Sequence, residues 1–110
     1  MRTPSRKQIQ VMALLNRQGA RLETKVRPTA NTYRVVVPTG AGTGWGPGEA
    51  LADDLKVEGI RAAVHPGWLA VPVGTLQRAL HVANMLRRVW ISRQLGKGQA
   101  TFIHILSRKG

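Results

Sequence analysis

Basic side chains suited to binding phosphate are concentrated in the two end segments of this 110-residue chain. Residues 1–34 carry eight basic side chains and one acidic side chain, and residues 76–110 carry seven basic side chains and no acidic one. The segment 35–75 has two basic and four acidic side chains, so the formal net charge of +12 belongs to the ends. A polyanion, most often nucleic acid, is the expected partner of so basic a chain, because like charges at this density repel.

These side chains are candidates for contacts with phosphate groups. The strength of such contacts does not depend on base sequence and falls as the salt concentration rises. No helix-turn-helix, zinc-finger or RNA-recognition signature accompanies them, so base-specific reading is not expected. Whether the two ends merge into one basic face or form a generally solvated surface stays open at this point. The predicted nucleic-acid-binding residues are Arg6, Lys7, Arg17, Arg21, Lys25, Arg27, Arg61, Trp68, Arg88, Arg108 and Lys109.

Three tryptophans suggest stacking on bases or contact with a partner. Trp68 is the best-placed aromatic, because it falls on the polar face of a predicted hairpin beside His65 and near Arg61. An equally good interpretation makes it a cap over a small core. Trp90 lies among apolar residues and is predicted to be core. Trp45 stands in a glycine-rich loop predicted to be mobile, where it is a possible contact, with Trp68, for a protein partner.

Catalytic, metal and cofactor chemistry has little support in the sequence. The glycine run at 40–48 lacks the Gly-Lys-Ser/Thr ending of a nucleotide-binding loop, and Glu49 after it repels anions. The three histidines have no metal-ligand spacing, and Asp53 and Asp54 point in different directions on a helix. With no cysteine there is no thiol nucleophile or thiolate site. We therefore expect a protein that is not an enzyme and has no cofactor.

The elements that must position these residues follow from periodicity and turn chemistry. Helices are predicted over 5–18, capped by Ser5, over 49–57, and over 76–94, capped by Thr75. An alternating strand at 21–27 and a β-branched and aromatic run at 32–37 form one hairpin, and a second hairpin, 60–65 with 68–73, turns at Pro66-Gly67. A break at 96–98 and a final strand at 100–106 complete the chain.

This order predicts an α+β fold in one domain, residues 1–110. Its mostly antiparallel sheet contains both hairpins and the C-terminal strand, and three helices pack on it. The turn register sets Val64 on the same, dry face as Leu69, and His65 beside Trp68 on the other face. The apolar arc of helix 76–94 is so broad that it indicates burial on most sides or cover by a second subunit.

A resemblance to a known family rests on short motifs within residues 9–74. The segment VMALLNRQGARLETKVRPTANTYRVVVPTG, the helix Leu51-Ala52-Asp53-Asp54-Leu55, the turn Pro66-Gly67 and the hairpin end Val71-Pro72 resemble the pre-motor α domain of FtsK/SpoIIIE-type DNA translocases. The resemblance implies a domain that helps to build a ring around duplex DNA. The glycine loop departs from the pattern, residues 75–110 show no match, and the Walker motifs of the ATPase motor are absent.

The function expected from the sequence is a non-enzymatic, oligomerising DNA-binding protein that contacts phosphates. One alternative is a protein–protein adaptor or a phage or plasmid inhibitor of a host machine, and another is an RNA-binding module. No apolar run approaches the length of a membrane span or a secretion signal, so a cytoplasmic location is expected.

Overall fold

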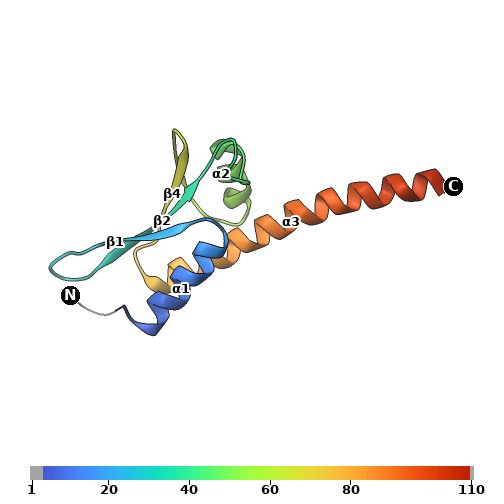
Figure 1. The fold of residues 1–110 in the computed structure, drawn as a ribbon. Helices are drawn as coiled ribbons and strands as arrows, with labels where there is room; N and C mark the ends of the chain where they lie inside the picture. Colours follow the sequence, from blue (N-terminus) through green and yellow to red (C-terminus); the bar gives the residue numbers. More distant parts are fainter. Residues whose placement is uncertain (1–3, 110) are drawn as a thin grey trace.

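The computed structural model describes residues 4–109, and describes side chains as far as residue 96. Four strands form one antiparallel sheet, and the helices lie against it (Figure 1). The elements are α1 (Arg6–Arg17), β1 (Arg21–Lys25), β2 (Thr32–Pro38), α2 (Gly48–Val57), β3 (Ala63–His65), β4 (Trp68–Pro72) and α3 (Leu76–Lys109). The α+β fold and both hairpins are therefore confirmed.

The sheet has the strand order β1-β2-β4-β3, so each hairpin contributes one central strand and one edge strand. The central strands pair through Val36 and Ala70. In the second hairpin, Val64 pairs with Leu69 and His65 with Trp68, which is the register predicted from the turn. Gly67 adopts a φ of 80°, as the third position of a type II turn requires.

One face of the sheet packs against all three helices and holds the hydrophobic core. Val35 and Leu69 on this face are fully buried against Leu15 of α1, Leu55 of α2 and Leu86 of α3. Both predicted helix caps are present, since the Ser5 hydroxyl accepts from the Gln8 amide and the Thr75 hydroxyl from the Arg78 amide. The other face points away from the helices, and we call it the open face.

The strand predicted at 100–106 is wrong, because α3 continues without a break to Lys109. Gly96 and Gly98 each cost the helix roughly 1 kcal/mol of stability, which weakens it but does not end it. A short apolar run fits strand or helix equally well, and a strand also needs a neighbour to pair with. The far half of α3 instead extends beyond the body of the domain (Figure 1). Among the described residues, no helix has the length and apolar character to cross a membrane.

Candidate nucleic-acid interface

The first hairpin places a basic cluster on and beside the open face. The β1–β2 register puts Arg21 opposite Val36, Glu23 opposite Arg34, and Lys25 opposite Thr32. Directly opposite residues share a face, so the three β1 side chains and Arg34 project away from the helices. Arg27 follows in the β1–β2 loop and is exposed. We call Arg21, Lys25, Arg27 and Arg34 the sheet cluster.

Glu23 is the one acidic side chain among them, and two arginines hold it. Its carboxylate accepts from Nε of Arg34 at 2.7 Å and from Nη2 of Arg21 at 2.9 Å. The hydrogen bond from Arg34, followed by the one from Arg21, lowers the pKa of Glu23 below its ordinary value. Glu23 therefore stays ionised at neutral pH. Its stabilising ion pairs are fully formed above its unfolded pKa and are lost as pH falls through the lowered folded value.

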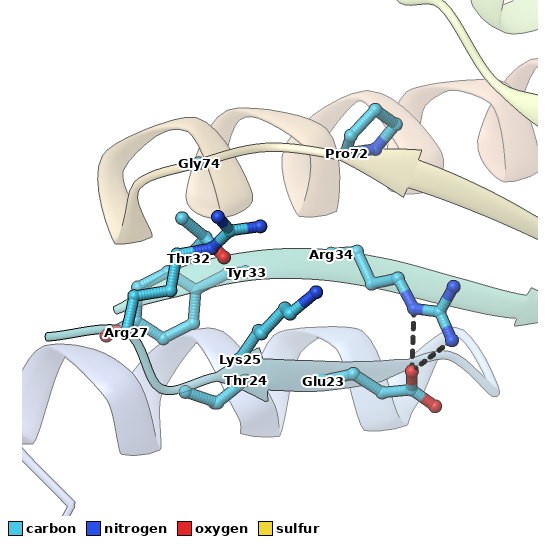
Figure 2. Close-up of a pocket in the computed structure, with 9 residues that line it drawn as sticks. All are labelled: Glu23, Thr24, Lys25, Arg27, Thr32, Tyr33, Arg34, Pro72 and Gly74. Carbon is cyan, nitrogen blue, oxygen red and sulfur yellow. Dashed lines mark hydrogen bonds and ion pairs between the residues drawn. The ribbon is translucent and has the colours of Figure 1, made fainter. Parts of the chain in front are cut away.

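The sheet cluster borders an open pocket of about 660 Å³ at the end of the sheet near the β1–β2 loop. Lys25, Arg27 and Arg34 all line it, and Figure 2 shows them at its rim with Glu23 joined to Arg34 by dashed lines. The remaining lining residues are uncharged, so the pocket has three cations against one acid that is already paired. Such a surface favours an anion of several charges over a neutral ligand.

A row of four side chains, one from each strand, crosses the open face. The Arg34 guanidinium carbon lies 5.2 Å from the centroid of the Trp68 ring, while its Nε donates to Glu23. Trp68 stacks on His65, with centroids 3.9 Å apart and planes inclined by 11°. We call Glu23, Arg34, Trp68 and His65 the stacked row. Cation–π and aromatic stacking hold its members in order across the sheet.

The predicted basic residues of α1 lie on the helical layer, away from the sheet cluster. Lys7 donates a hydrogen bond to Gln77 at the start of α3. Arg17 lines a pocket of about 180 Å³ between α1 and α3, together with Arg87. Arg6 is exposed in the first turn of α1. The structure therefore separates the basic residues between positions 4 and 34 into two groups on different layers.

The other predicted contacts are scattered. Arg61 lies just before β3 and lines a pocket beside α2 with Asp53. Arg88 lines a pocket between α2 and α3 together with Glu58, while Asp54 in the same pocket is paired with Arg93. The side chains of Arg108 and Lys109 lie outside the described residues.

Trp45 is not a surface contact, and the loop that carries it is anchored. Its side chain is 2% exposed, and its indole Nε1 donates to the Gln18 carbonyl oxygen at 2.7 Å. Trp90 packs edge-on against it at 5.1 Å between centroids. Arg93 donates to the Trp45 carbonyl oxygen and is paired with Asp54. The burial of Trp45 contradicts both the mobile loop and the contact for a protein partner, because the ring fills the core.

Sequence reasoning missed two members of the interface, Arg34 and His65. Arg34 was counted among the basic residues but sits in a β-branched strand that indicates core. Alternation along β2 puts Arg34 on the same face as Thr32 and on the other face from Val35, so pairing Arg34 with Glu23 across the hairpin would have revealed it. His65 was placed beside Trp68 but not proposed to bind anything. Among the described residues, no group of three acidic, histidine or cysteine side chains is arranged to hold a metal ion.

Comparisons with protein-family models, with curated proteins and with solved structures found no match to this chain.

Proposed function

We propose that this protein is a non-enzymatic DNA-binding protein that contacts phosphates through the sheet cluster and associates with itself through α3. The observation that carries the proposal is the gathering of Lys25, Arg27 and Arg34 around one open pocket whose acid is already paired. The resemblance of residues 9–74 to the DNA-translocase domain favours DNA over RNA.

The geometry suits a charged polymer better than a small substrate. The pocket is open to solvent and lies at the edge of a broad face, so a chain of phosphates can run through it and beyond it. Each phosphate that pairs with an arginine or a lysine releases condensed counterions, which makes affinity fall steeply with salt. Contacts of this kind carry no base information, in keeping with the absence of any base-reading motif.

The direct test measures fluorescence anisotropy of a labelled DNA duplex and of a labelled single strand. We expect binding by at least one of them at low salt, with log affinity falling linearly against log salt. A slope of roughly −2 to −4 corresponds to three or four phosphate contacts. Absence of binding to both DNAs at low salt overturns the proposal. Affinity that does not change with salt contradicts binding through phosphate contacts.

Self-association is assigned to α3, where it leaves the domain. Its buried residues, including Ala79, Val82 and Leu86, face the domain's own core, so the broad apolar arc is mostly covered within the chain. Farther along, Ile91 is 42% exposed and Leu95 is 59% exposed, one turn apart on the same side. A second copy of α3 supplies the matching apolar surface, in the manner of a helix pair.

Replacing Ile91 and Leu95 together with glutamine is expected to weaken self-association at least tenfold, because both side chains lose their apolar contact area. Sedimentation equilibrium measures the change. Val26→Gln is the matched control, since Val26 is 79% exposed and lies in the β1–β2 loop rather than on or beside α3. Because α3 carries seven basic and no acidic residues, association should strengthen with added salt. A wild-type protein that is monomeric at every salt concentration contradicts the assignment.

A further inference from the structure

The stacked row ends at His65, and among the described side chains nothing stacks on the outer face of its ring. Trp68 is covered by Arg34 on one side and by His65 on the other. His65 belongs to β3, the edge strand, so its second ring face points away from the sheet. Within residues 4–96, no other aromatic ring or cation stacks on His65. The imidazole is half-buried, with one ring face stacked on Trp68.

The row is rigidly supported from beneath. Val36 and Ala70 pair with each other on the open face, yet they are 0% and 5% exposed. No helix covers them, because they lie outside the hydrophobic core cluster of the other face. The larger side chains of the row, Arg34 and Trp68, stand over them and exclude water. The rings are therefore held in their stacking orientation before any ligand arrives, which lowers the entropy cost of binding.

We propose that an unpaired base of single-stranded DNA extends this row by stacking on the outer face of His65. This inference rests on the proposed DNA-binding function and names the form of DNA that the open face takes. Bases stack on aromatic side chains whatever their sequence, because every base has a π face. Neighbouring strands are about 4.8 Å apart, so β3 and β1 lie about 14 Å apart across the sheet. The register also puts Lys25 six positions along the strands from the level of Trp68, which adds roughly 20 Å. The next few phosphates of the strand then reach Arg34, Lys25 and Arg27 in the pocket.

The stacked row favours single-stranded DNA because only an unpaired base has a free face to stack on His65. A base inside a duplex is already stacked on both faces and cannot join the row without leaving its helix. In the strand register, the open-face neighbours of the aromatic pair are Pro38, which lies opposite Trp68, and Ala63 and Ala70, which lie two residues along β3 and β4. Their side chains have no donor or acceptor for a 2′-hydroxyl group, the feature by which proteins recognise RNA.

The test compares His65→Ala, His65→Phe and the control His81→Ala, which removes an exposed imidazole from α3. Each protein is titrated against a labelled oligothymidylate of about 15 nucleotides, the matching oligouridylate, and a DNA duplex of the same length. We expect His65→Ala to weaken oligothymidylate binding about tenfold. His65→Phe should restore the wild-type affinity because it restores a flat ring. Duplex binding should change less than twofold in all variants.

Three outcomes overturn the inference; the first two leave the proposed function intact, and the third favours the RNA-binding alternative. One is unchanged oligothymidylate affinity in His65→Ala, and another is an equal loss for single strand and duplex. The third is oligouridylate binding at least tenfold tighter than oligothymidylate binding, which assigns the site to RNA. Failure of the wild-type protein to bind any of the three probes contradicts the proposed function itself, so the two failures are distinguishable.

Discussion

Replacing Lys25, Arg27 and Arg34 together with glutamine is expected to weaken DNA binding about 100-fold at roughly 0.1 M salt. Each phosphate contact contributes about 0.7 to 0.9 to the salt slope, so three lost contacts remove about 2 to 3 from it. Between the usual 1 M reference and about 0.1 M salt, a difference of about 2 to 3 in the slope corresponds to a loss of DNA affinity of roughly 100- to 1,000-fold. Anisotropy titrations at several salt concentrations measure both the affinity and the slope.

The matched control carries the same change of charge on the helical layer. Arg6, Lys7 and Arg17 of α1 are replaced with glutamine, and we expect less than a fivefold loss of affinity, from the weakened long-range field alone. Glu23→Gln provides a change of the opposite sign, because it frees Arg21 and Arg34 for phosphate and should tighten binding. Equal losses in the two triple variants would place the DNA on both layers and contradict a site confined to the sheet cluster.

Replacing Trp45 with alanine is expected to destabilise the fold by about 3–5 kcal/mol, the usual cost of removing a buried large aromatic side chain. The substitution leaves a cavity between α1, the glycine loop and α3, and removes the donor to the Gln18 carbonyl oxygen. A domain of this size has about 5–15 kcal/mol of stability in total. Thermal unfolding followed by circular dichroism should show the melting temperature fall by about 15 °C or more.

Two further variants separate the packing of Trp45 from the flexibility of its loop. Trp45→Phe keeps a ring in the core and should lose less stability than Trp45→Ala, while its DNA affinity stays that of the wild type. Ala41→Ser changes an exposed loop position and should leave the melting temperature unchanged. An unaltered melting temperature for Trp45→Ala is the result expected of a mobile, solvent-exposed tryptophan, and it would exclude the anchored loop.

The anchored loop also explains one glycine that the sequence presents only as part of a run. Gly44 has a φ of 82°, and a Cβ atom there would lie 2.9 Å from the Trp90 ring. The close approach of the loop backbone to Trp90 thus requires a residue without a side chain. The run itself suggested mobility, because alternating glycines favour no conformation until a neighbour packs against them.

Local signals in the sequence were sufficient for most of the elements. Ser5 and Thr75 marked the beginnings of two helices through their hydroxyl groups, and Pro66-Gly67 set the register of the second hairpin. These signals act between residues close together in the chain, so they need no knowledge of the fold. The end of α3 was mispredicted because its structure depends on residues that are distant in the chain. Whether a short apolar run becomes a strand depends on a distant neighbour to pair with.

The sequence by itself determined where the charge lies and which side of its own hairpin each residue faces. It placed Lys25 on a basic face and His65 beside Trp68, because alternation along a strand and a tight turn are local properties. Only the tertiary structure decided that the two hairpins join through β2 and β4, which brings Arg34 against Trp68 and completes the stacked row. It also decided that α1 lies on the opposite layer and that Trp45 is buried. Contacts between distant segments depend on the packing of the whole core, which no local pattern encodes.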